Sequence, residues 1–176
     1  MASLTGFDRE ITCAFTGHRP KALPWGDWEG DPRCLALKER LKEAVTRAYD
    51  LGYRHFICGM AQGSDLYFGE AVVRLRLVHP EVTLEGAVPF PDQCKRWPIP
   101  DQKRYQDLLE QCDMETLIQQ SYTPSCMHRR NRYMVDHASR LIAVYNGLGQ
   151  RGGTLGTLNY AMETGVEVDL LEIEAG

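Results

Sequence analysis

The stretch LIAVYNGLGQRGGT at residues 141–154 joins a continuous apolar run to a glycine-rich loop. An unbroken apolar run of this length is typical of a strand that is buried on both faces of a parallel sheet. The glycines that follow permit positive φ angles and a close backbone approach to a ligand, and Thr154 can cap the helix predicted at Thr154–Thr164. This segment therefore predicts a parallel α/β sheet in which a loop after a strand binds a phosphate group.

The rest of the chain alternates short apolar runs with longer helical patterns. Besides Leu141–Tyr145, strands are predicted at Ile11–Phe15, Arg54–Cys58, Val82–Val88 and Glu115–Ile118, and an edge strand at Val166–Ile173. Helices are predicted from Pro32 to Leu51, from the 59–65 loop to about Val78, and at Asp101–Cys112 and Met127–Ser139. This order predicts an α/β fold, a three-layer αβα sandwich with a mainly parallel sheet, as a single domain over residues 1–176.

Length and composition are those of an ordinary globular protein, with 176 residues, 43% apolar and 25% charged. The formal net charge of -4 argues against a protein that coats nucleic acid with its whole surface. No apolar run approaches the ~18 residues that span a membrane, and residues 1–10 show no secretory signal. Six cysteines form no CxxC pair. We therefore expect a cytoplasmic protein with reduced cysteines, no membrane association and no metal site.

The first loop that could carry chemistry is Thr16-Gly17-His18-Arg19, directly after a predicted buried strand. In doubly wound sheets, ligands bind beyond the carboxyl ends of the strands. Gly17 lets the backbone pass close to a ligand, and Arg19 can pair bidentately with phosphate or carboxylate. His18 can titrate or donate a hydrogen bond. The alternative is a plain turn with a surface arginine, but the position after a buried strand favours ligand contact.

The second loop follows the strand that ends at Cys58, and its residues of interest are Gly59, Met60, Gly63, Ser64 and Asp65. Its small residues allow a tight strand-to-helix turn. The backbone N–H groups of residues 63–65 would point outward from a helix N-terminus, where an anion is stabilised. Ser64 and Asp65 either cap this helix or contact a ligand. In the second case Asp65 would accept hydrogen bonds from ribose hydroxyls or orient a water.

The third loop gives the strongest local signal for phosphate binding, through Gly152, Gly153 and Thr154. It is not a P-loop, because no Lys-Ser/Thr pair follows the glycines. A GxGxxG pattern is also absent after the first strand, which argues against an ordinary NAD dehydrogenase. Weaker candidates are a base-stacking pair after the third strand and three polar residues on the helix near 127–139. These are Pro89 and Phe90, and Arg129, Asn131 and Arg132.

Several motifs occur together and in a characteristic order. They are Phe15-Thr16-Gly17-His18-Arg19, Gly59-Met60-Ala61-x-Gly63-x-Asp65, Pro89-Phe90 with Gln93 and Trp97, Asn131-x-x-Met134-Val135-Asp136, and Gly152-Gly153-Thr154 with Tyr160-Ala161. In these motifs the chain resembles the YpsA-like family of the SLOG superfamily, to which DprA and the LOG-type (lysine decarboxylase-like) nucleotide hydrolases also belong. The resemblance covers about residues 11–172.

The resemblance implies a Rossmann-like fold that binds a nucleotide or a nucleotide-derived ligand. It implies that the site is lined by Gly17, Arg19, Gly59, Gly63, Asp65, Gly152, Gly153 and Thr154. The LOG-type enzymes hydrolyse N-glycosidic bonds and carry a glutamate three residues after the threonine of their glycine loop. Here that place falls on Thr157 or Tyr160, neither of which is acidic. This departure argues against the LOG-type mechanism.

We therefore expect a cytoplasmic binding or sensing domain for a small nucleotide-derived ligand such as NAD or ADP-ribose, with no certain cofactor. One alternative is an N-glycoside hydrolase of the phosphoribohydrolase type, in which Asp65 assists the attacking water. Another is DprA-like binding of single-stranded DNA, for which this short acidic chain shows no added basic domain. We thus do not expect a nucleic-acid partner, and a homo-oligomer stays open.

Overall fold

The computed structural model of the protein describes residues 7–148 and 153–174. Within these residues, parallel strands form a six-stranded sheet in the order β4-β3-β2-β1-β5-β6. The strands are β1 (Thr12–Gly17), β2 (His55–Cys58), β3 (Thr83–Val88), β4 (Met114–Leu117), β5 (Arg140–Tyr145) and β6 (Glu167–Glu172). Every neighbouring pair runs parallel. The predicted parallel sheet is therefore confirmed.

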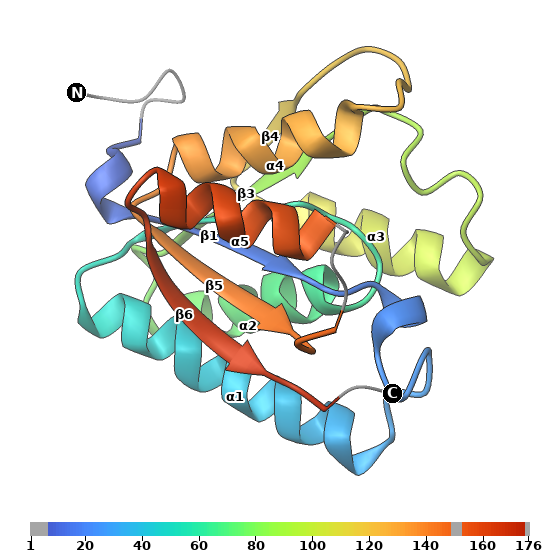
Figure 1. Ribbon diagram of the computed structural model, residues 1–176, viewed down its shortest axis with the longest axis horizontal. Helices are drawn as coiled ribbons and strands as arrows, with labels where there is room; N and C mark the ends of the chain where they lie inside the picture. Colours follow the sequence, from blue (N-terminus) through green and yellow to red (C-terminus); the bar gives the residue numbers. More distant parts are fainter. Residues whose placement is uncertain (1–6, 149–152, 175–176) are drawn as a thin grey trace.

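Helices cover both faces of this sheet and give the three layers seen in Figure 1. They are α1 (Pro32–Asp50), α2 (Ser64–Val78), α3 (Ile99–Gln111), α4 (Cys126–Asp136) and α5 (Gly153–Glu163), with short 3₁₀ turns at Arg9–Ile11 and Pro20–Ala22. Buried side chains of α1, α2 and α3 form one core cluster with one face of the sheet. Those of α4 and α5 form a second cluster with the other face. The protein thus has the predicted Rossmann-like three-layer α/β fold.

The fully buried aromatic rings of the core lie on one side of the sheet. Toward α1 and α2, the Phe15 and Phe68 rings stack with their centroids 4.6 Å apart. Toward α4 and α5, the buried strand residues include Ala14, Ala87 and Ala143. The larger Ile57 and Leu141 lie on the same face, and the buried side chains of α4 and α5 pack against it.

Helix boundaries follow local capping signals. Asp31 caps α1 as predicted, because its side chain accepts a hydrogen bond from Arg33 N at 2.8 Å. The prediction that the fourth helix runs to Ser139 is wrong, since α4 ends at Asp136. Ser139 N donates to Thr12 O at 3.1 Å, so the chain has already turned toward the sheet. Ile11 lies in a 3₁₀ turn rather than in the first strand.

The strand order places a switch point between β1 and β5. From β1 the chain moves outward through β2, β3 and β4, and it then returns to the other side of β1 to form β5. Loops that leave neighbouring strands at such a point turn in opposite directions and open a crevice at the carboxyl edge of the sheet. β6 forms the predicted edge, and the exposed Glu167 and Glu172 at its ends discourage pairing with another strand. In the described part of the chain, no helix is long and apolar enough to cross a membrane.

Candidate functional site

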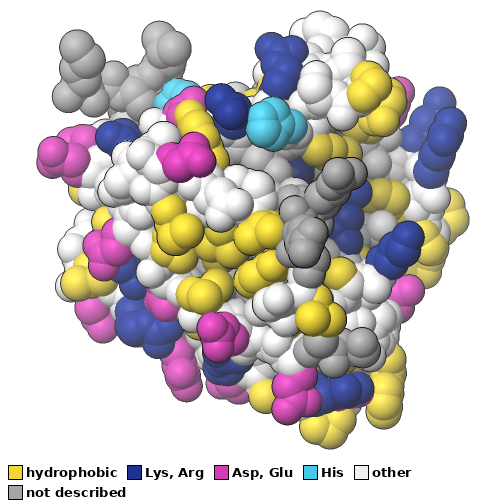
Figure 2. Space-filling model, in the orientation of Figure 1, with side chains coloured by type: hydrophobic (Ala, Val, Ile, Leu, Met, Phe, Trp, Pro, Cys, Tyr) yellow, Lys and Arg dark blue, Asp and Glu magenta, His cyan; other side chains and the backbone are white. Residues whose placement is uncertain are grey.

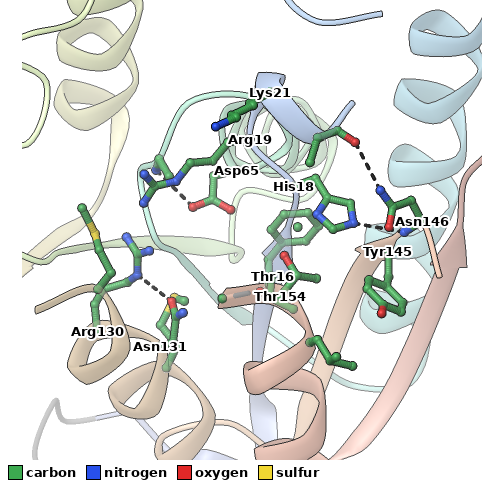
Figure 3. Close-up of a pocket in the computed structure, with 18 of the residues that line it drawn as sticks. Thr16, His18, Arg19, Lys21, Asp65, Arg130, Asn131, Tyr145, Asn146 and Thr154 are labelled. Atoms are coloured by element: carbon green, nitrogen blue, oxygen red, sulfur yellow. Dashed lines mark hydrogen bonds between the residues drawn. The ribbon is translucent and has the colours of Figure 1, made fainter. Parts of the chain in front are cut away.

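A cavity of about 570 Å³ lies at this switch point. Its walls come from the loop after β1, the start of α2, the inner face of α4, the loop after β5 and the first turn of α5. Figure 3 shows Arg19, Asp65 and Arg130 grouped on one side, His18, Tyr145 and Asn146 on the other, and Thr154 between them. The three loops singled out in the sequence therefore meet at one place in the fold.

The loop after β1 is tied to the loop after β5 through His18. Asn146 N donates a hydrogen bond to His18 Nε2 at 3.0 Å. Burial holds the pKa of His18 below its ordinary value, so the ring is neutral at neutral pH. Because Nε2 accepts a hydrogen bond, the proton of the neutral ring is assigned to Nδ1. Thr16, Gly17 and Arg19 also line the cavity, with Thr16 buried and Arg19 exposed at its rim.

The loop after β2 is locked onto the same segment. Ser64 donates from its hydroxyl to His18 O at 2.6 Å and from its backbone N–H to the same oxygen at 3.2 Å. Gly63 precedes it with a φ of 83° and serves as the N-cap of α2 without a side-chain hydrogen bond. Ser64 therefore connects two loops rather than capping the helix. The predicted site residues Gly59, Met60, Gly63 and Ser64 are not among the described residues that line the cavity, whereas Ala61 and Asp65 of the same segment are.

Gly63 offers a direct test of this interlocked turn. A Cβ at this position would lie 2.9 Å from His18 O, in addition to the unfavourable φ. Gly63→Ala should therefore lower the free energy of unfolding by about 1–3 kcal/mol more than a glycine substitution without a clash. Gly26→Ala is the matched control, because Gly26 also has a positive φ (57°) but meets nothing within 4 Å. Urea denaturation of both variants measures the difference, and equal stabilities would contradict the interlocked turn.

Asp65 is a buried carboxylate in the cavity wall. Its Oδ2 accepts a hydrogen bond from Ala61 N at 3.0 Å. Burial raises the pKa of Asp65 above its ordinary value, while the positive charges of Arg130 and Arg19 and the hydrogen bond from Ala61 oppose this shift. The remaining acceptor capacity of the carboxyl is thus available to a hydroxyl or a water in the cavity.

Arg130 lines the cavity although the sequence did not predict it as a site residue, and the same is true of Lys21, Tyr145 and Asn146. The Arg130 guanidinium is buried. Nη1 donates a hydrogen bond to Gly59 O at 2.5 Å, and Nε donates one to Asn131 Oδ1 at 2.8 Å. A sequence signal for this placement is the apolar Met134, because Arg130 lies one helical turn before it on the same face. Asn131, a predicted site residue, does line the cavity.

Arg129 and Arg132 lie outside the cavity wall, on other faces of α4. Arg129 Nη1 donates to Gln119 Oε1 at 2.6 Å, and Arg132 Nε donates to His128 Nε2 at 3.0 Å. The structure therefore does not bring these two arginines to the cavity. Pro89 and Phe90 are also elsewhere, because β3 is two strands away from β1, and Phe90 packs edge-on against Tyr122 at 5.4 Å.

The first turn of α5 completes the cavity with Gly153, the buried Thr154 and Leu155. The first N–H groups of a helix have no intrahelical acceptor and carry a partial positive charge, so they stabilise an anion. Gly152, predicted to share this role, lies outside the described residues. Thr157 and Tyr160 stand at the two positions that correspond to the LOG-type glutamate. The Thr157 hydroxyl donates a hydrogen bond to Gly153 O at 2.6 Å, and the Tyr160 hydroxyl donates one to Asp136 at 2.5 Å.

The charges of the cavity favour an anionic ligand. Among its described lining residues, Arg19, Lys21 and Arg130 are cations and Asp65 is the one carboxylate. Figure 2 shows Lys and Arg side chains over much of the visible face, and on its left and lower parts Asp and Glu side chains lie among them. The described residues contain no group of three or more His, Cys, Asp or Glu side chains that could hold a metal ion.

Comparisons with known proteins agree with this architecture. The family model YpsA, described as the YspA SLOG family, matches residues 13–169. An uncharacterised SPbeta prophage-derived protein, YoqJ of Bacillus subtilis, is 31% identical over 150 residues, which cover 76% of this chain and 85% of YoqJ. The UPF0398 protein YpsA of the same organism is 26% identical over 136 residues, which cover 76% of this chain and 74% of YpsA.

A solved structure with the same fold is that of the DNA processing protein A of Helicobacter pylori, which was studied for its single-stranded DNA binding mode. The TM-score is 0.59 and the sequence identity is 13%, and the match covers 92% of this chain and 65% of that one. At this identity the likeness establishes the fold alone.

Proposed function

Because the chain belongs to the YpsA family, the YspA SLOG family, we propose that it binds a small nucleotide-derived ligand such as ADP-ribose or NAD at the switch point. The observation that carries this proposal is the excess of positive charge in the cavity, where three cations and the first turn of α5 surround a single buried carboxylate. Phosphate is the anion that arginine forks and helix N-termini bind together.

The other surfaces of the cavity suit the rest of such a ligand. Tyr145, Leu148 and Leu155 line it with aromatic and aliphatic groups, which fit a base or a ribose face. Asp65 supports recognition of ribose hydroxyls, because a carboxyl oxygen accepts hydrogen bonds from them. Ligand pockets in proteins combine apolar walls with a few fixed polar groups in this way, at volumes of roughly 300–1,000 Å³.

Isothermal titration with ADP-ribose, NAD, AMP and ribose 5-phosphate tests the proposal. At least one phosphate-bearing compound should bind, and Arg19→Ala should weaken that binding about 10–100-fold, because a charge-assisted hydrogen bond contributes roughly 1.5–3 kcal/mol. Arg129→Ala is the matched control, since Arg129 is an exposed arginine that does not line the cavity. Failure of the folded wild-type protein to bind any of the four compounds would count against the proposal.

Hydrolysis of an N-glycosidic bond is a second use of the same site, and the buried Asp65 with its raised pKa supports it. A buried carboxyl with a raised pKa can act as a general acid or base toward a leaving base or an attacking water. Incubation with the ligand found by titration, followed by chromatography of free base, tests this activity. If Asp65→Asn releases base at the same rate as wild type, Asp65 takes no part in the reaction.

Single-stranded DNA binding is supported by the face of α4 opposite the cavity wall. Arg129 and Arg132 are exposed there, and Tyr122 presents an exposed aromatic ring beside Phe90. Exposed cations and aromatic rings together bind single strands by phosphate contact and base stacking. Fluorescence anisotropy with a labelled oligothymidine should then show binding that weakens steeply as salt rises. No complex at low salt would remove this candidate.

A further inference from the structure

A polar cluster lies in the core under α4, away from the cavity. The carboxylate of Glu85, in the middle of β3, is fully buried. It accepts hydrogen bonds from His55 Nε2 at 2.7 Å, from the Thr116 hydroxyl at 2.8 Å and from the Tyr133 hydroxyl at 2.5 Å. His55 Nδ1 in turn lies 2.7 Å from the Thr83 hydroxyl. This cluster joins β2, β3, β4 and α4.

The cluster holds an ionised carboxylate in an apolar layer. Burial would raise the pKa of Glu85, but the hydrogen bonds from His55, Tyr133 and Thr116 hold it below its ordinary value. Burying a charge is costly, and a hydrophobic replacement is often neutral or stabilising, so such a cluster is weak evidence of a stabilising role. A documented use of buried polar contacts is instead to fix one packing arrangement among several.

The apolar packing of α4 is compatible with a cluster that fixes one arrangement of this helix. Met134 and Val135 pack on a layer that includes Ala14 and Ala87 of the sheet. Apolar contacts with small side chains have little directional preference, so they do not by themselves set the rotation or the axial position of a helix. The Tyr133 hydroxyl adds a directed contact between α4 and β3. Arg130 lies one turn earlier on the same helix, and its contact with Gly59 O depends on that setting.

We propose that Tyr133, held by Glu85, is a positioning residue that sets α4 so that the Arg130 guanidinium reaches Gly59 O and the wall of the cavity. Tyr133 does not touch the cavity and acts through the helix. The effect on the geometry of Arg130 is inferred from the hydrogen bonds of Tyr133 to Glu85 and of Arg130 to Gly59 O. The effect on ligand affinity rests on the proposed function.

Two variants that remove one hydrogen bond each from the same carboxylate separate positioning from stability. Tyr133→Phe removes the bond that comes from α4, whereas Thr116→Val removes the bond that comes from β4. Both should lower the melting temperature, because both leave Glu85 with one donor fewer. Only Tyr133→Phe should move Arg130. The readout is the pKa of the Asp65 carboxyl, followed by carbon-13 NMR titration, because Arg130 lowers that pKa.

The expected result is a further rise in the Asp65 pKa in Tyr133→Phe and none in Thr116→Val. Affinity for ADP-ribose, where wild type binds it, should fall about tenfold in Tyr133→Phe only. Equal behaviour of the two variants, or a Tyr133→Phe protein with an unchanged Asp65 pKa, would overturn the proposal. The NMR titration needs no ligand, so it decides the positioning role even if ADP-ribose does not bind.

Discussion

Arg130→Met should lower the free energy of unfolding by about 3 kcal/mol and reduce the affinity for ADP-ribose at least about 100-fold. Methionine keeps much of the buried side-chain volume but removes the charge and both hydrogen bonds. Gly59 O then loses its donor, and the buried Asp65 loses the larger of its two neighbouring positive influences. Leaving a buried carboxylate uncompensated is among the most costly single changes in a protein core.

Chemical denaturation and calorimetric titration of Arg130→Met measure the two effects. Arg129→Met is the matched control, since it removes the neighbouring arginine of the same helix from an exposed position, and it should change stability by less than about 0.5 kcal/mol. The double variant Arg130→Met with Asp65→Asn should be more stable than Arg130→Met alone, because it removes the stranded charge. If Arg130→Met is as stable as Arg129→Met, the buried Arg130 has no energetic role.

Asp65→Asn should be more stable than wild type at neutral pH, by on the order of 1 kcal/mol. The folded-state pKa of Asp65 is raised by burial, so the unfolded chain releases this proton more readily than the folded one. Its stabilising contribution is therefore complete below the unfolded pKa, which is about 3.9, and is lost as the pH rises through the folded pKa. Asparagine keeps the shape and the acceptor for Ala61 N without the charge.

Urea unfolding from pH 3.5 to pH 8 checks this sign. The advantage of Asp65→Asn should be near zero at the acid end, where wild-type Asp65 is protonated, and should grow as the pH rises. The same variant should bind ADP-ribose about tenfold more weakly, because the amide accepts fewer hydrogen bonds from ribose hydroxyls. A variant that is less stable than wild type across this whole range would show that attraction to Arg130 outweighs burial.

Much of the fold followed from local pattern. The apolar run at 141–145 and the glycines after it identified β5 and the loop to α5, and Asp31 with Pro32 identified the start of α1. Alternation of strands and helices then implied a parallel sheet, and parallel sheets place their ligand sites at carboxyl ends. Chain order therefore predicted that the three loops lie at the same edge of the sheet, whereas their meeting in one cavity depends on the strand order.

The predicted face of α4 is not the one that reaches the cavity. Arg129 and Arg132 are three residues apart and share a face, which suggested an anion site, but that face is solvent-exposed. Met134, which is buried against the sheet, lies one helical turn after Arg130, so Arg130 is on the inner face of α4. Pro89 and Phe90 were placed near the site because they follow a strand. The distance of β3 from β1 depends on strand order, which local patterns do not encode.

The buried cluster under α4 had no sequence signal either. Glu85 stands within β3, and a charged residue in a strand is ordinarily an exposed one. Its burial requires that His55, Thr116 and Tyr133, from three other elements, converge on it. Such convergence is a property of the assembled fold and becomes visible only when the elements are placed in space.

A crystal structure of the protein grown with saturating ADP-ribose tests the central claim most directly. The account predicts ADP-ribose at the switch point between β1 and β5, with a phosphate within hydrogen-bonding distance of the first-turn N–H groups of α5 and of the Arg19 or Arg130 guanidinium. It also predicts a ribose hydroxyl at Asp65. Density for ADP-ribose on another surface, with the cavity between α4 and the loop after β1 empty, would contradict it.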